Sequence, residues 1–97
     1  MLSVRRTYVL GQASAKWEVN WWKRLIEHTF LPDIKRAYSE DAIAEVEVSE
    51  AGGYIFMEVL GNRDAVDALE ARLKEWSRLR SGRDQWIFPH VVSEEVA

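Results

Sequence analysis

Two histidines are the first candidates for acid–base or metal chemistry, because the histidine side chain gains or loses its proton near neutral pH. His28 lies in a segment with helical periodicity, and His90 follows a proline near the end of the chain. They are far apart in the sequence and no ligand spacing connects them, so no metal site is predicted. The chain has no cysteine, which excludes thiolate chemistry and disulfides. No catalytic residue is assigned and no cofactor is expected.

Aromatic residues are more informative, since Trp17, Trp21 and Trp22 fall within six residues. At roughly 100° per residue, the apolar side chains of the expected helix 15–30 spread over about 220° of its circumference, whereas covering one face of a sheet needs about 100° or somewhat more. The excess apolar surface of this helix predicts a groove, a dimer contact or a partner site, because aromatic residues dominate such interfaces. His28 lies at the edge of this set. The alternative is that another segment of the same domain covers the second side.

A β-hairpin is expected over residues 43–60, which contain a pair of glycines at 52–53. Glycine pairs favour two-residue turns because both turn residues need a positive φ. This turn sets the register so that Val48 faces Met57 and Glu47 faces Glu58.

The two faces of this hairpin differ in composition. The expected core face carries Ala44, Val46, Val48, Ile55, Met57 and Val59. The other face carries Tyr54, Phe56 and Leu60 among glutamates. Like charges opposite each other destabilise a strand pair, so we interpret the glutamate pair as part of a solvated face.

The remaining elements are a strand, two helical segments and a last strand. Neither the odd-numbered nor the even-numbered residues of strand 3–10 are uniformly apolar, so the sequence does not decide which side of the strand faces the core. The side to which Tyr8 points is therefore not predicted. Pro32 is expected to break the first helix, because the residue before a proline disfavours the helical conformation. One or two further turns follow over residues 33–38. A second helix is expected to be capped by Asp64.

The last strand is expected over residues 86–92. It contains Pro89, which cannot donate to a ladder and therefore favours a sheet edge. Residues 93–97 are expected to be a frayed tail.

The element order is strand, helix, strand, strand, helix, strand, which is typical of an α+β fold. With right-handed crossovers it predicts a ferredoxin-like βαββαβ sandwich, in which a four-stranded antiparallel sheet has the order 4-1-3-2 and both helices cover one face. At 97 residues, the chain 1–97 is expected to form one domain.

The composition is that of a globular protein, with 47% hydrophobic and 30% charged residues. A net charge of −3 gives no electrostatic argument for binding nucleic acid or an anionic membrane. No stretch approaches the roughly 20 apolar residues of a transmembrane span. The apolar run 8–10 is shorter than the roughly 7–15 residues of a signal peptide, so a cytoplasmic location is expected.

Some segments resemble known families of this topology. Residues 53–59, followed by 64–69, resemble the third strand and second helix of the ACT-like, bacterial YbeD-like family, and residues 28–33 match its helix end of a histidine followed by Pro-Asp. The stretch between the glycines is also similar to the NIL ligand-binding domain of methionine importers. These resemblances cover roughly residues 8–76 and imply a ferredoxin-like domain.

The same span resembles an RNA-recognition motif, with Tyr54 and Phe56 at aromatic positions of its RNP1 segment and Tyr8 at the RNP2 aromatic. Gly52 replaces the leading basic residue of RNP1. Glutamates on the hairpin would place negative charge on the RNA platform, which argues against this function.

We therefore expect a non-enzymatic ligand-sensing or protein-interaction module that forms a homodimer through the open sheet face, the tryptophan-rich helix or both. Small molecules and other proteins are both possible partners. The expected contact set is Trp17, Trp21, Trp22, His28, Tyr54, Phe56 and Leu60.

Two other functions are kept as alternatives. The first is single-strand or RNA binding, with phosphate contacts from Arg5, Arg6, Arg78, Arg80 and Arg83. The second is a small cofactor-free enzyme with an aromatic pocket, for which His28 is the candidate acid or base.

Overall fold

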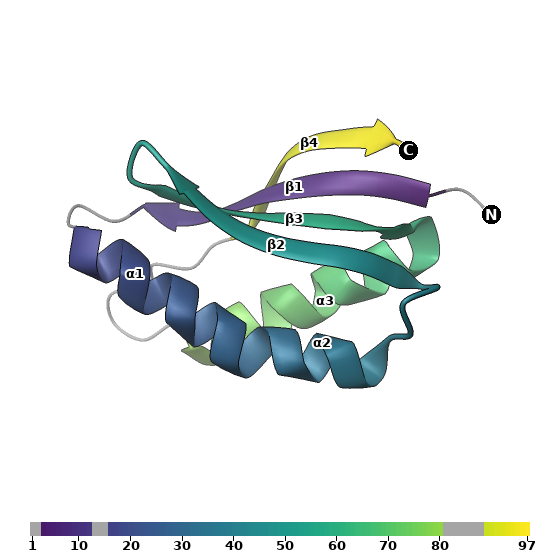
Figure 1. Ribbon diagram of the computed structural model, residues 1–97, viewed down its shortest axis with the longest axis horizontal. Coiled ribbons are helices and arrows are strands. Elements are labelled where there is room, and N and C mark those ends of the chain that lie inside the picture. Colours follow the sequence, from purple (N-terminus) through teal and green to yellow (C-terminus); the bar gives the residue numbers. More distant parts are fainter. Residues whose placement is uncertain (1–2, 13–15, 81–88) are drawn as a thin grey trace.

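The computed structural model describes residues 3–12, 16–80 and 89–97, in which a four-stranded antiparallel sheet is covered on one face by helices (Figure 1). The elements are β1 (Ser3–Gln12), α1 (Lys16–Leu25), a π-helical turn η1 (Ile26–Phe30), α2 (Leu31–Ala37), β2 (Ile43–Ala51), β3 (Tyr54–Asn62), α3 (Arg63–Arg80) and β4 (His90–Val96). The strand order β2-β3-β1-β4 is the expected 4-1-3-2 counted from the other edge. No helix among the described residues is long and apolar enough to cross a membrane.

The register of the β2–β3 hairpin is confirmed: Val48 lies opposite Met57, and Glu47 opposite Glu58. Gly52 and Gly53 have φ angles of 60° and 83°, so the turn uses the conformation that favours glycine. One part of the expected core face is wrong. The register shifts between residues 43 and 45, and this irregularity leaves Ala44 exposed instead of buried.

The orientation of β1, which the sequence left open, is decided by its even-numbered residues. Val4, Tyr8 and Leu10 are buried against the helices, with at most 1% of their surface exposed. Arg6 shares this face and is itself buried. Tyr8 is therefore absent from the open sheet face, which removes the RNP2-type aromatic from any RNA platform.

The expected helix break at Pro32 is wrong. The helix continues from α1 through η1 into α2, and the expected start at residue 15 lies outside the described residues. Proline lacks an N–H group and its ring crowds the carbonyl four residues earlier. In η1 the Leu31 N–H bonds to the Ile26 carbonyl, five residues back, and this wider turn accommodates the proline at the start of α2.

The core lies between the sheet and the helices. α1, η1 and α2 contribute Val19, Trp22, Ile26, Phe30 and Ile34, and α3 contributes Val66, Leu69 and Leu73. The residue that caps α3 is Asn62 and not the expected Asp64. The Asn62 side chain accepts a hydrogen bond from the Ala65 N–H, and Asp64 lies in the first turn of the helix.

β4 is an edge strand, as the proline suggested, but its bounds differ from the expectation. The strand begins at His90, after Pro89, and residues 86–88 lie outside the described part of the chain. The expected frayed tail is wrong, because β4 pairs with β1 up to Val96 and the Ala97 N–H bonds to the Ser3 carbonyl. Every residue of β4 is exposed.

Gly61 on β3 should be a stability-determining position. A Cβ atom there would lie 2.4 Å from the Ala42 carbonyl oxygen, which is backbone and cannot move aside by changing rotamer. We expect Gly61→Ala to lower the free energy of unfolding by about 1–3 kcal/mol, the range for overpacked sites. Denaturant unfolding of the variant and the parent measures this. Gly52→Ala is a useful comparison, since its added methyl meets no atom within 4 Å and its cost comes only from the positive φ. Equal stability of Gly61→Ala and the parent would contradict the prediction.

Candidate functional site

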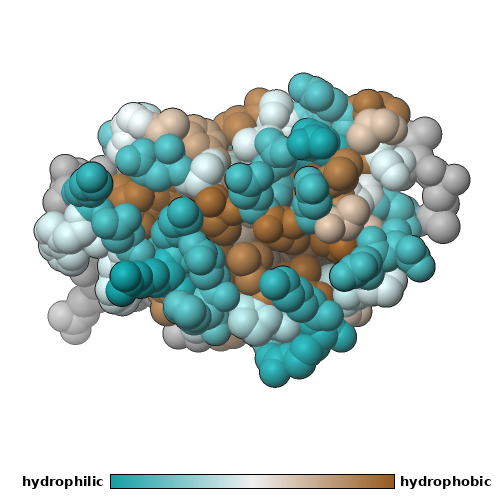
Figure 2. Space-filling view, in the orientation of Figure 1, coloured by the Kyte–Doolittle hydropathy of each residue, from teal (hydrophilic) through white to brown (hydrophobic). Residues whose placement is uncertain are grey.

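A groove lined mainly by apolar residues lies between β2 and α2. It encloses about 340 Å³, within the usual range for binding pockets. Figure 2 shows hydrophobic residues gathered in this hollow, between the sheet edge and the helix. The buried floor is made by Ile34 and Ile43, and the half-buried walls by Leu31, Tyr38 and Val46.

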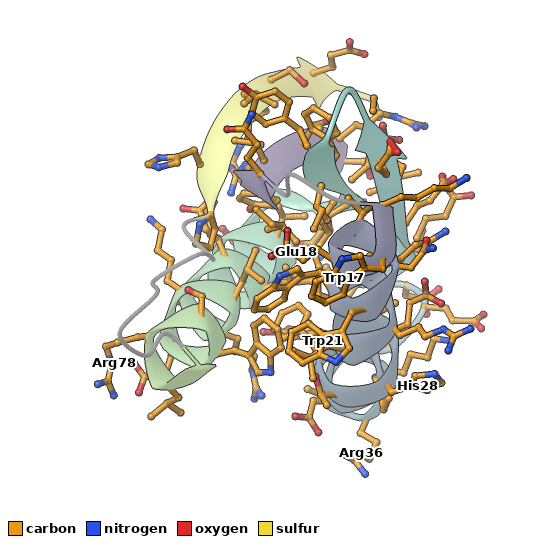
Figure 3. The ribbon with its side chains drawn as sticks, turned by 90° about the vertical axis from the view of Figure 1, so that its left-hand side faces the viewer. Trp17, Glu18, Trp21, His28, Arg36 and Arg78 are labelled. Atoms are coloured by element: carbon orange, nitrogen blue, oxygen red, sulfur yellow. The ribbon has the colours of Figure 1, made fainter. Side chains whose placement is uncertain are left out.

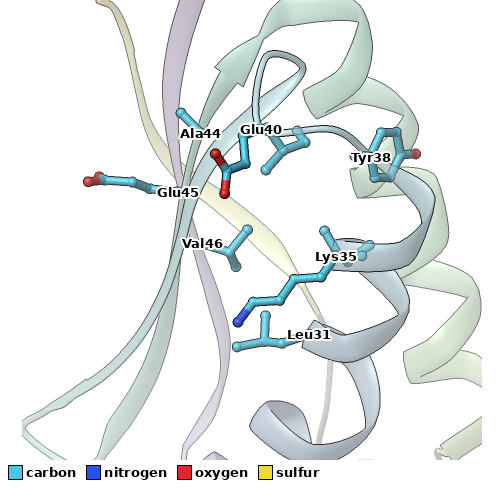
Figure 4. Close-up of a pocket in the computed structure, with 9 residues that line it drawn as sticks. Leu31, Lys35, Tyr38, Glu40, Ala44, Glu45 and Val46 are labelled. Atoms are coloured by element: carbon cyan, nitrogen blue, oxygen red, sulfur yellow. The ribbon is translucent and has the colours of Figure 1, made fainter.

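Local features of the chain keep this groove open. Leu31 and Lys35 of α2 extend toward β2, whereas the ring of Tyr38, directly after α2, points away from β2 (Figure 4). The Arg72 guanidinium of α3 lies 5.7 Å from the centre of the Tyr38 ring, a cation–π contact that positions this wall. The irregularity at Ala44 adds a small side chain at the rim.

The rim of the groove is charged. Lys35 extends from α2 across the mouth toward β2, Glu40 points into the same opening, and Glu45 points away (Figure 4). Further exposed carboxylates follow along or beside β2: Asp41, Glu47 and Glu50. None of these five carboxylates forms an ion pair among the described residues. The edge of the sheet beside the groove is therefore acidic.

The tryptophans of α1 separate into two environments. Trp22 is 6% exposed and belongs to the core, so it cannot contribute to an exposed contact set. Trp17 is 70% exposed and Trp21 49% exposed, and both lie on the side of α1 that faces α3 (Figure 3). The Trp21 ring packs edge-on against Trp22, with 4.9 Å between the ring centres. We call Trp17 and Trp21 the tryptophan surface.

His28 does not join this surface. Its exposed side chain points to the opposite side of the helix from Trp21 (Figure 3). His90 lies on β4, so the two histidines belong to different elements. The described residues contain no group of three or more His, Asp or Glu side chains that could hold a metal ion. The expected aromatic environment for a histidine acid or base is therefore missing.

The open sheet face carries the remaining predicted contact residues. Tyr54 is 43% exposed and its ring centre lies 6.4 Å from that of Phe56, while Phe56 and Leu60 are half-buried. Arg5 donates to Glu58 at 2.5 Å across the middle of this face, which offsets the repulsion from Glu47. The structure thus places the predicted contact residues in separate regions and does not bring them together.

The buried ionisable groups form a network around Arg6. Its guanidinium contacts Asp67 at 2.8 Å and Glu70 at 3.2 Å, both on α3, and donates through Nε to Glu94 of β4 at 2.7 Å. The Tyr8 hydroxyl donates to Glu70 at 2.9 Å. Lys74 also reaches Glu70, at 3.3 Å. Each buried charge has opposite partners, so the arrangement is suited to holding elements together.

Two pKa values shift in this network. Burial raises the pKa of Tyr8 above its usual value, and the hydrogen bond to Glu70 raises it further, while Arg6 opposes the shift. Burial alone would lower the pKa of Arg6, but its interactions with Tyr8, Glu94 and Asp67 outweigh that effect, so the pKa is raised. Arg6 stays charged and Tyr8 stays neutral at any physiological pH.

Comparison with protein-family models, curated proteins and solved structures finds no match.

The groove is not predicted by the sequence patterns. Pro32 predicts the end of a helix, and regular strand alternation places Ala44 on the core face. One signal was present, because Leu31, Ile34 and Tyr38 recur at three- and four-residue spacing across the proline. That periodicity indicates a helix continuing through Pro32 with an apolar side.

Tyr8 should make the protein less stable at alkaline pH. Above about pH 10 a tyrosine in the unfolded chain ionises, whereas folded Tyr8 keeps its proton because its pKa is raised. The stabilisation by the protonated Tyr8 hydroxyl is complete below this pH, and it is lost as the pH rises toward the pKa of Tyr8 in the folded protein. In that range the free energy of unfolding should fall by up to about 1.4 kcal/mol per pH unit from this group.

Denaturant unfolding across alkaline pH tests this on the parent, Tyr8→Phe and the exposed control Tyr54→Phe. We expect a shallower alkaline decline for Tyr8→Phe only. If Tyr8→Phe declines as steeply as the parent, the raised pKa of Tyr8 is wrong.

Proposed function

We propose that this chain is a non-enzymatic protein-interaction module that forms a homodimer through the tryptophan surface. The observation that carries the proposal is the exposure of Trp17 and Trp21, at 70% and 49%, on the same side of one helix. Tryptophan is rare at such exposure and is enriched at the energetic centres of interfaces. Trp22, on the same helix, already supplies a core contact, so packing α1 on the sheet does not explain the exposure of Trp17.

Charge favours this surface over the open sheet face as the dimer contact. The open face carries Glu45, Glu47, Glu58 and Glu95 with Arg5 as the opposing charge. Two such faces stacked by a twofold axis would bring carboxylates together, which opposes association. α1 carries Lys16, Glu18, Lys23 and Arg24, a mixture of both signs.

Three further aspects belong to the same proposal. The element order and the strand order support a ferredoxin-like βαββαβ topology. Membership of a YbeD-like or NIL-like family would suit a small interaction domain. A cytoplasmic location would suit a chain without cysteine.

The two alternative functions have less support. For RNA binding, Tyr8 is buried, Arg5 is paired with Glu58, and Arg6 and Arg78 are paired with carboxylates. The side chains of Arg80 and Arg83 lie outside what the structure describes. For an enzyme, His28 lies away from the aromatic side chains that would form its pocket.

Light scattering of the parent at several concentrations tests the homodimer. We expect a dimer whose dissociation constant rises about tenfold or more in Trp17→Gln, because a central interface tryptophan contributes about 2 kcal/mol or more. Trp17 is chosen because it is the more exposed of the two tryptophans and its replacement should leave the fold intact. Circular dichroism checks that it does.

Tyr54→Gln is the matched control, an exposed aromatic on the open sheet face that should leave the dimer unchanged. A parent that stays monomeric at high concentration would overturn the homodimer. A dimer weakened by Tyr54→Gln and not by Trp17→Gln would move the contact to the open sheet face.

A further inference from the structure

The groove beside β2 combines two features that bind polypeptide in different ways. β2 is an edge strand that pairs with β3 on one side, and no described strand lies on its other side. Its outward backbone N–H and C=O groups are therefore available to an added strand. Beside this edge lies the cavity of about 340 Å³ with its floor of Ile34 and Ile43.

This pairing of an edge with an apolar groove fits an extended peptide. In an added strand, backbone groups bond to the edge while alternate side chains point to opposite faces. One set of side chains would enter the groove against Leu31 and Val46, and the other would lie beside Glu45 and Glu47 on the open-face side. A compact small molecule would use the cavity alone and leave the edge unpaired.

Charge indicates the chemistry of the peptide. Glu40, Asp41, Glu45, Glu47 and Glu50 lie on or beside β2 without ion pairs among the described residues, and Lys35 is the cation that reaches over the groove. Arg36, next to Lys35, is already paired with Asp33. A segment with lysine or arginine at alternate positions would neutralise these carboxylates, and one with acidic residues would be repelled.

A second copy of the chain fits this edge poorly. Antiparallel pairing of two β2 strands would bring their glutamates together. Pairing β2 with β4 of another copy would join different surfaces, which gives rings or open filaments instead of a twofold dimer, and β4 carries Glu94 and Glu95.

We propose that the groove between β2 and α2 binds an extended, positively charged segment of another protein, which adds to β2 as a fifth strand and places apolar side chains in the cavity. This site is separate from the tryptophan surface, so it does not depend on the homodimer.

Fluorescence anisotropy with labelled nine-residue peptides, the length of β2, tests the proposal on the full chain. An alternating valine–lysine peptide should bind. Alternating valine–glutamate and serine–lysine peptides should bind at least about tenfold more weakly, the first because of its charge and the second because it lacks apolar side chains.

Backbone methylation separates strand addition from simple charge attraction. Two versions of the valine–lysine peptide are methylated on alternate backbone nitrogens, one on the odd-numbered residues and one on the even-numbered residues. The version whose methylated nitrogens face β2 loses the N–H donors of the ladder and should bind about tenfold or more weakly. The other version should retain its affinity. Equal binding of the two methylated peptides would overturn strand addition.

A pair of protein variants locates the site. Ala44 is exposed at the rim of the cavity, so Ala44→Lys places bulk and positive charge there and should weaken binding about tenfold or more. Ala71→Lys adds the same side chain at an exposed position of α3 and should leave binding unchanged.

Three further results would overturn the proposal. They are equal weakening by the two variants, equal binding of the lysine and glutamate peptides, and binding of an apolar dye to the groove with no binding of any peptide. The last result would assign the groove to small ligands.

Discussion

The Arg6 guanidinium lies where β1, β4 and α3 meet, and much of the fold depends on how its charge is satisfied. A buried charge is tolerated only when it is paired, since removing it from water costs several kcal/mol. Carboxylates from α3 and β4 surround it, and Glu70 is shared with the Tyr8 hydroxyl. These contacts are satisfied only if the even-numbered residues of β1 face the helices, which is also the orientation that buries Val4, Tyr8 and Leu10.

The two sheet edges are consequently held in different ways. β4 buries none of its residues, and its attachment relies on ladder hydrogen bonds together with Glu94, which reaches Arg6 and also lies 3.7 Å from Arg63. β2 is attached through a tight hairpin and needs no ion pair for its place in the sheet. Its carboxylates therefore remain unneutralised. The result is a molecule with a charge-compensated edge at β4 and an acidic edge at β2, and this asymmetry makes β2 the edge that a cationic partner would recognise.

Sequence reasoning worked where the deciding contacts are local. The hairpin register follows from a glycine pair and strict alternation, and the strand order follows from the handedness of short connections. The side of the sheet to which Tyr8 points could not be predicted, because Arg6 points to the same side and a charged residue argues against burial. The partners that neutralise Arg6 lie 64 and 88 residues away in the sequence. A helical wheel indicated excess apolar surface on α1, but it could not decide that Trp22 turns inward while Trp21 remains half exposed. That choice depends on the position of the whole helix over the sheet.

The groove went unpredicted because it arises from two departures from regular geometry. The π-helical turn carries the helix past Pro32 and so extends an apolar side beyond the point where a proline would ordinarily end it. On the facing strand, the irregularity at Ala44 takes one residue out of alternation and leaves a small side chain where a regular strand would turn its side chain inward. The groove exists only because α2 and β2 face each other in the folded chain. Irregular turns and strand shifts often lie beside functional sites. Here the strand shift at Ala44 lines the cavity and the π-helical turn ends directly before the lining residue Leu31, which is why we assign binding to this edge and not to the regular centre of the sheet.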